Sequence, residues 1–156
     1  MLNEPKWDVV FELVSIINEF KKNLDKSNDL NLDNIILDTR ISINKKIHLN
    51  KKYFNYNDDF FKLVIFYVDE TISKYLNKNY KKWSLLQLEY FSVNNGGQLF
   101  FDVLDNSLLK LIDDNIFTIK TGYFLLKHGF VGKFYDSQQD IMKYSSKLEE
   151  ILINWS

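Results

Sequence analysis

Cysteine is absent from this chain of 156 residues, which excludes disulfide bonds, thiolate metal sites and a cysteine nucleophile. Proline occurs once, as Pro5, so the chain has no proline-rich linker. Arginine also occurs once, as Arg40, and lysine is a poor substitute where a planar, bidentate contact with phosphate is needed. The formal net charge is only -1. These features argue against nucleic-acid recognition and give no global attraction to an anionic surface.

Long hydrophobic runs are missing as well. The longest, Leu63 to Val68, is far shorter than the roughly 20 residues of a membrane-spanning helix. The first residues include Asn3, Glu4 and Pro5, where a secretory signal would need a basic and then an apolar stretch. The composition, 46% hydrophobic and 16% aromatic, is that of a packed globular protein. We therefore expect residues 1–156 to form a single soluble domain.

Apolar residues recur at intervals of three and four along most of the chain, which is the spacing of amphipathic helices. We expect about seven helices, over residues 7–24, 32–54, 57–77, 83–91, 98–111, 113–129 and from 137 to about 152. Ser137 with Asp140 resembles a capping box that opens the last of these helices. Gly96-Gly97 is expected to form a hinge or sharp corner. The predicted fold class is all-α, a compact helical bundle.

The predicted central helix carries the first candidate site. Residues 60–68 are apolar on almost every side, and Asp69 and Glu70 follow directly, so at least one carboxylate is expected to face the buried side. It could accept hydrogen bonds from a lysine, a tryptophan N–H or helix-terminal amides and so join two helices. Alternatively, the pair could be an exposed acidic patch for a partner protein. A catalytic pair is disfavoured, because adjacent helical residues point about 100° apart.

A second candidate is the segment from Gly129 to Tyr135, between two predicted helices. Gly129 is expected to cap the preceding helix in a left-handed conformation, with Phe130 and Phe134 packed into the core. Lys133 and Tyr135 would then be exposed contacts beside this elbow.

Motifs for chemistry are lacking. The two histidines, His48 and His128, lie on different predicted helices and have no carboxylate at the spacing of a helical metal site. Gly132-Lys133 is followed by Phe134, not by the Ser or Thr of a phosphate-binding loop. We predict no catalytic residue, no metal and no cofactor.

The order of several short motifs resembles the DotU/TssL (IcmH-like) family of bacterial secretion systems, over roughly the C-terminal two thirds of the chain. The motifs are Asp69-Glu70, the segment Trp83-Ser84-Leu85-Leu86, the segment from Gly96-Gly97 to Asp105, and the segment from Tyr123 to Phe134 with its Gly129-Phe130-Val131-Gly132.

This resemblance implies a non-enzymatic scaffold at the cytoplasmic face of the bacterial inner membrane, in a type VI or a type IVB system. It implies an all-helical cytoplasmic domain of seven or eight helices in two small bundles arranged as a hook, followed by a transmembrane anchor that we expect to be missing from residues 1–156. The implied partners are an IcmF/TssM-type membrane subunit and a TssK-type baseplate subunit, with at most weak homodimerisation and no nucleic acid.

The family's functional positions are carried over residue by residue. The resemblance implies that Asp69 and Glu70 bind a partner or shape a cleft, and the Gly-Phe-x-Gly-Arg pattern appears with Lys133 in place of arginine. Structural roles are implied for a further set: Trp83, Gly96, Gly97, Gly129, Phe130, Gly132 and Phe134. Two alternatives stay open, a helical adaptor or immunity-type protein with another partner, and a small hydrolase that would use Asp69, Glu70 and His128.

Overall fold

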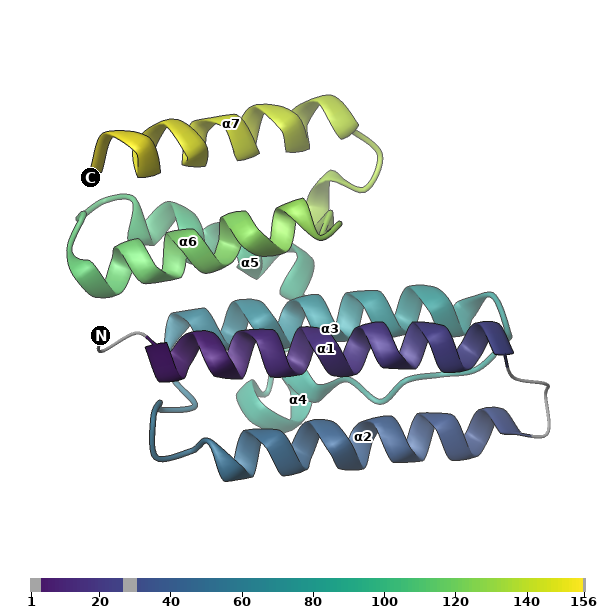
Figure 1. Cartoon of the computed structure of the whole chain (residues 1–156). Coiled ribbons are helices and arrows are strands. Elements are labelled where there is room, and N and C mark those ends of the chain that lie inside the picture. The colour runs from purple at the N-terminus through teal and green to yellow at the C-terminus, as the bar shows by residue number, and fades with distance from the viewer. Residues whose placement is uncertain (1–3, 27–30, 156) are drawn as a thin grey trace. The chain divides into compact units, whose positions relative to one another are not determined.

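The computed structural model describes residues 4–26 and 31–155, and within these ranges it contains α-helices, short 3-10 segments and no strand. The elements are α1 (Glu4–Lys26), α2 (Leu32–Leu49), α3 (Asp59–Asn77), α4 (Leu86–Phe91), α5 (Gly96–Ser107), α6 (Asp113–Lys127), η2 (Gly132–Phe134) and α7 (Gln138–Trp155). Figure 1 shows them along the chain. The all-α prediction and the expected number of about seven helices are confirmed for the described residues.

The chain divides into two compact units. Unit 1 comprises residues 1–56 and 71–84, and unit 2 comprises residues 57–70 and 85–156. Because the division falls between Glu70 and Thr71, the helix α3 contributes its first part to unit 2 and its last part to unit 1.

Unit 1 is built on an antiparallel pair, α1 and α2, which run in opposite directions and pack on each other (Figure 1). The buried face of α1 consists of Val9, Val10, Leu13, Val14, Ile17 and Phe20. Phe11 is exposed and stacks on Trp7 with ring centroids 5.2 Å apart.

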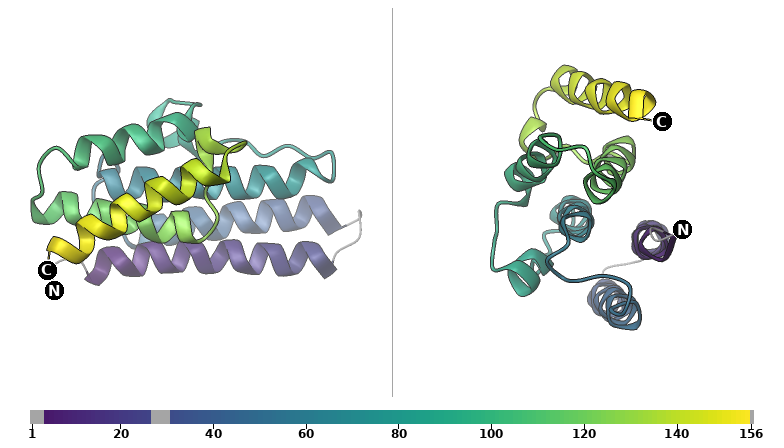
Figure 2. Two further views of the ribbon diagram at one scale, coloured as in Figure 1. Left: turned by 90° about the horizontal axis from the view of Figure 1, so that it is seen from above. Right: turned by 90° about the vertical axis from the view of Figure 1, so that its left-hand side faces the viewer.

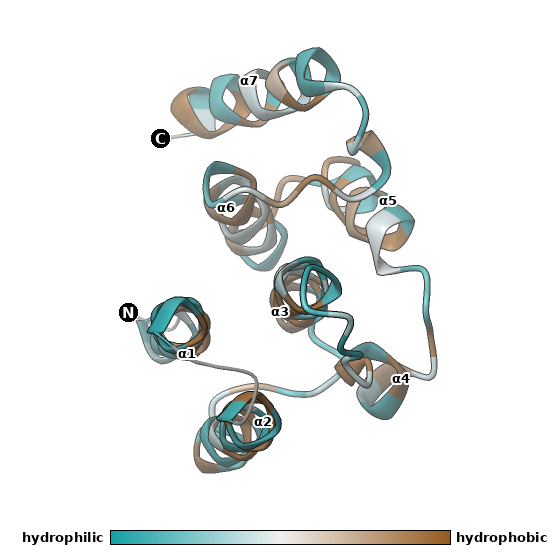
Figure 3. Cartoon of the chain, turned by 90° about the vertical axis from the view of Figure 1, so that its right-hand side faces the viewer, coloured by the Kyte–Doolittle hydropathy of each residue, from teal (hydrophilic) through white to brown (hydrophobic). Residues whose placement is uncertain are grey.

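In unit 2, α7 runs back along α6 in the opposite direction and packs on it (Figures 1 and 2). α5 packs on α6 and on η2. Both hydrophobic and hydrophilic residues occur along α7, α1 and α2 (Figure 3), which is the composition of helices that are buried on one side only. The apolar run of α3 is different, because Phe60, Phe61 and residues 63–68 are all buried.

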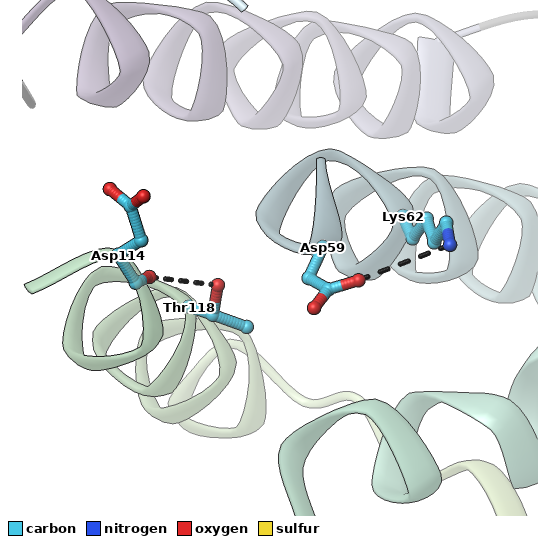
Figure 4. Close-up of polar contacts among 4 residues, drawn as sticks. All are labelled: Asp59, Lys62, Asp114 and Thr118. Atoms are coloured by element: carbon cyan, nitrogen blue, oxygen red, sulfur yellow. Dashed lines mark hydrogen bonds and ion pairs between the residues drawn. The ribbon is translucent and has the colours of Figure 1, made fainter. Parts of the chain in front are cut away.

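Polar side chains near the starts of α3 and α6 have ion-pair or hydrogen-bond partners within the same helix (Figure 4). Asp59, in the first turn of α3, pairs with Lys62 at 3.9 Å, and an acidic side chain is favourable at this end of a helix. The buried hydroxyl of Thr118 donates to the backbone oxygen of Asp114 at 3.2 Å. In this way α6 can bury threonine without leaving its hydroxyl unpaired.

Several predicted boundaries were wrong, including the end of the fifth helix, which lies at Ser107 and not at Leu111. The second helix ends at Leu49 and not near Phe54, because Asn50 closes it with hydrogen bonds to Lys46 and Ile47. The fourth begins at Leu86 and not at Trp83, since residues 81–85 are not helical. Gly96-Gly97 is the first turn of α5 and not a hinge before it.

Charge is distributed unequally between the two units. Unit 1 contains thirteen Lys and Arg against eight Asp and Glu, a net charge of +5. Unit 2 contains seven Lys against thirteen Asp and Glu, a net charge of -6. The near-neutral total therefore conceals a basic unit and an acidic unit.

Candidate functional site

Asp69 follows the buried run of α3 and is itself only 1% exposed. Its Oδ1 accepts a hydrogen bond from the backbone N–H of Leu86 at 2.9 Å, and its Oδ2 accepts one from the backbone N–H of Gln87 at 2.9 Å. These N–H groups belong to the first turn of α4, where a helix has no internal acceptors for its amides. Asp69 therefore caps α4 from another helix, although it lies 17 residues earlier in the sequence.

The side chain of Gln87 extends this connection to a third helix. Its Nε2 donates to Asp69 Oδ2 at 3.0 Å, and its Oε1 accepts from the backbone N–H of Gly96 at 2.8 Å. Gly96 is the first residue of α5, so one buried chain of hydrogen bonds joins α3, α4 and α5. We call Asp69, Gln87 and Gly96 the Asp69 relay. Of the alternatives left open by the sequence, the structure shows the helix-terminal amides as the partners of Asp69.

Glu70 binds a different segment of unit 2. Its Oε1 accepts from the backbone N–H of Gly132 at 2.7 Å, and its Oε2 accepts from the backbone N–H of Val131 at 2.9 Å. A carboxylate that binds two successive backbone amides fixes their orientation, and such charge-assisted bonds are stronger than neutral ones. The two acidic side chains thus hold different parts of unit 2 and do not converge.

The elbow held by Glu70 is tightly packed. Gly129 and Gly132 have φ angles of 102° and 51°, a region that favours glycine. A Cβ atom on Gly132 would lie 2.6 Å from the backbone oxygen of Gly97, so these two glycines allow α5 and η2 to touch. Phe130 is buried and stacks on Phe100 with centroids 3.9 Å apart.

The exposed side of the elbow presents the two remaining candidates. Tyr135 is 79% exposed, and Lys133 is also exposed. The Lys133 ammonium lies 5.1 Å from the ring centroid of Phe134 and 5.4 Å from that of Phe101, so its stem follows an aromatic surface. Phe134 packs edge-on against Phe101 at 4.7 Å. Lys133 and Tyr135 are thus exposed and Phe130 is buried, as predicted, whereas Phe134 is only half-buried.

Trp83 lies in unit 1 and is mostly buried. The guanidinium of Arg40 sits 4.9 Å from the Trp83 ring centroid, and its NH1 donates to the backbone oxygen of Ser84 at 2.6 Å. In the sequence, Arg40 stood out only as the single arginine, and this contact was not predicted. The presence of a single arginine in a lysine-rich chain could have indicated this contact, because a site that combines stacking with hydrogen bonding needs a planar side chain.

A second pair missed by the sequence analysis is Asp105 and Tyr144. The Tyr144 hydroxyl donates to Asp105 Oδ1 at 2.5 Å. Burial raises the pKa of the Tyr144 phenol above its ordinary value, and the hydrogen bond to Asp105 raises it further. The tyrosine therefore stays protonated and ties α7 to α5.

The groups of the hydrolase alternative are not arranged for shared chemistry. His128 is exposed after the end of α6, with Nδ1 2.9 Å from the backbone oxygen of Phe124, whereas Asp69 is buried against α4. Within residues 4–26 and 31–155, no three His, Asp or Glu side chains are grouped so that they could hold a metal ion.

Comparison with known families decides the assignment. The family model described as type VI secretion system protein DotU matches residues 56–155. The chain belongs to the DotU family. It is therefore a component of type VI secretion systems, and its family is a structural, membrane-associated one.

A solved structure supports the same fold. DotU from Francisella novicida superposes with a TM-score of 0.75 at 24% sequence identity, covering 96% of this chain and 99% of that one. No curated protein sequence gives a significant match. Across the described part of this DotU-family chain, no helix combines the length and the apolar character needed to cross a bilayer.

Proposed function

We propose that this chain is a non-enzymatic scaffold that joins an IcmF/TssM-type membrane subunit to a TssK-type baseplate subunit, at the cytoplasmic face of the inner membrane. Membership of the DotU family supports the setting. The observation that carries the proposal is that both family carboxylates bind backbone amides inside unit 2. Glu70 holds the elbow from whose surface Lys133 and Tyr135 project.

In this proposal the acidic pair shapes the binding surface and does not itself contact the partner. A carboxylate that is 1% exposed has almost no area to offer another protein. Glu70 is partly exposed, but its oxygens already accept from Val131 and Gly132. Lys133 and Tyr135 are better contacts, because each presents a polar tip on an apolar body.

The geometry of the site favours neither the hydrolase nor the adaptor with an unrelated partner. General acid-base catalysis requires groups within hydrogen-bond reach of one substrate, whereas Asp69 and Glu70 hold separate segments. An adaptor with an unrelated partner would differ from the proposed scaffold only in the identity of that partner. Any self-association of the chain is proposed to be weak.

The test is a pull-down from native membranes followed by mass spectrometry. We expect the double variant Lys133→Ala, Tyr135→Ala to lose the IcmF-type or the TssK-type subunit while its melting temperature stays unchanged. The matched control is Lys78→Ala, Tyr80→Ala, which removes an exposed Lys and Tyr from unit 1 and should retain both subunits.

Two results would contradict the proposal. Retention of both subunits by the Lys133, Tyr135 variant would show that the elbow is not part of the interface. Recovery of neither subunit by the folded wild-type chain would reject the scaffold role itself.

A further inference from the structure

A basic segment lies at the end of α2 and in the turn that follows it. Between Asp38 and Asp58 the chain has no acidic residue. Residues 45–56 include four lysines, which are Lys45, Lys46, Lys51 and Lys52. All but Lys46, which is half-buried, are exposed. The charge of unit 1 is therefore locally concentrated on a short stretch of chain.

Apolar and aromatic side chains are interleaved with these lysines and reach solvent. Leu49 is 57% exposed, Tyr53 is 42% exposed and Tyr56 is 38% exposed. The half-buried Phe54 packs against Tyr56 with ring centroids 5.9 Å apart, and Lys52 lies 5.0 Å from the centroid of the Tyr53 ring. We call residues 45–56 the basic-aromatic turn.

The turn is held in a defined conformation by Asn50. Its backbone N–H donates to Lys46 and Ile47, and its side chain donates to Lys46 at 2.8 Å and to Glu12 of α1 at 2.9 Å. The backbone N–H of Tyr53 then donates to the Asn50 oxygen at 3.0 Å. Cations and rings are thus presented on an ordered support, which lowers the entropy cost of binding.

Helix stability alone does not account for this composition. Lys46 and His48 lie in the last turn of α2, where basic side chains complement the helix dipole. That effect fades beyond the last turn, whereas Lys51 and Lys52 lie outside the helix. It also gives no reason to expose Leu49 and Tyr53.

We propose that the basic-aromatic turn binds the headgroup layer of an anionic lipid bilayer. Lysine clusters are attracted to anionic lipid surfaces, and amphipathic tyrosine rings settle at the boundary between headgroups and acyl chains. Nucleic acid would use the same cations and could stack on the tyrosines, but it would leave the exposed Leu49 unused. This contact goes beyond the proposed scaffold role and does not depend on any protein partner.

The test measures binding of the chain to vesicles of phosphatidylcholine, with and without a third of phosphatidylglycerol, by co-sedimentation. Binding is expected only to the anionic vesicles, and it should weaken as salt screens the lysines. Replacing Lys45, Lys46, Lys51 and Lys52 with Gln should weaken binding at least about a hundredfold, since each lysine contributes about fivefold. The double variant Leu49→Ser, Tyr53→Ser should weaken it several-fold without changing its salt dependence.

A matched control separates this site from diffuse charge. Replacing Lys110, Lys120, Lys143 and Lys147 with Gln removes four exposed lysines from unit 2 and should leave vesicle binding within about twofold. Circular dichroism and melting should be unchanged in every variant. The proposal is overturned if anionic vesicles are not bound, if the control variant loses as much binding as the test variant, or if the chain binds a single-stranded oligonucleotide more tightly than vesicles.

Discussion

In both units a charged side chain on one helix binds the backbone of another segment, but the charges of these side chains are opposite. In unit 1 the tie is a cation on the surface, Arg40, which binds one carbonyl and one ring. In unit 2 the ties are the buried anion Asp69 and the half-buried anion Glu70, which bind backbone amides. Removing an exposed tie lets water replace it, whereas removing a buried acceptor leaves donors unpaired. The comparison therefore predicts a much larger loss of stability for changes in unit 2.

The largest effect is expected from Asp69→Ala. Three donors would lose their acceptor, two of them in the first turn of α4, so the free energy of unfolding should fall by about 3 kcal/mol. The measurement is urea denaturation, with the exposed Asp136→Ala as control at under about 0.5 kcal/mol. An unchanged stability for Asp69→Ala would show that the buried tie is unimportant.

A smaller loss is expected from Gly132→Ala. The new Cβ would meet the Gly97 oxygen at 2.6 Å, at a φ of 51°, so we expect about 2 to 3 kcal/mol from backbone strain and displacement. Gly129→Ala is the matched control, because its φ is 102° but nothing lies within 4 Å of the added atom. Equal losses for the two variants in thermal unfolding would mean that the close approach of α5 and η2 contributes nothing.

In unit 1, Arg40→Lys should cost only about 1 kcal/mol. Lysine keeps the charge but loses the planar group that lies over Trp83 while donating to Ser84. Tryptophan fluorescence during denaturation would follow the change, with Lys22→Ala as an exposed control. A loss of stability as large as that of Asp69→Ala would contradict the expected difference in stability loss between the two units.

The smallest effect at neutral pH, and the only pH-dependent one, is expected from Tyr144→Phe. The raised pKa keeps the folded phenol neutral, while the unfolded tyrosine ionises near pH 10. Wild-type stability should therefore fall as the pH rises above about 10, by under about 1 kcal/mol per pH unit for this partly exposed group, and the variant should fall less steeply. Parallel pH profiles from stopped-flow or equilibrium unfolding would reject a coupled Asp105–Tyr144 pair.

Much of the fold was predictable because helical periodicity is a local property. The helix from Asp59 to Asn77 and the capping contact between Ser137 and Asp140, at 3.3 Å, follow the predicted pattern. The residues around Trp83 were wrongly predicted as helical, since their conformation depends on Arg40 in a distant helix.

Only part of the candidate site could be predicted, because its contacts join residues that are distant in the sequence. The apolar run before Asp69 indicates burial, but nothing near it in sequence reveals Gln87 as the partner. The exposed positions of Lys133 and Tyr135 follow from the glycines of the elbow, while their role in binding stays a prediction. The net charge of -1 gave no indication of the basic-aromatic turn, because the positive charge of unit 1 and the negative charge of unit 2 nearly cancel in the sum.

The Asp69 relay also has a consequence for how the chain folds. At six residues, α4 is too short to persist alone in water, so it can form only once α3 supplies its cap. Amide exchange at Leu86, Gln87 and Gly96 should therefore require opening of the whole of unit 2, and not local fraying. The shortest α-helix of unit 2 would then be among its slowest to exchange with solvent.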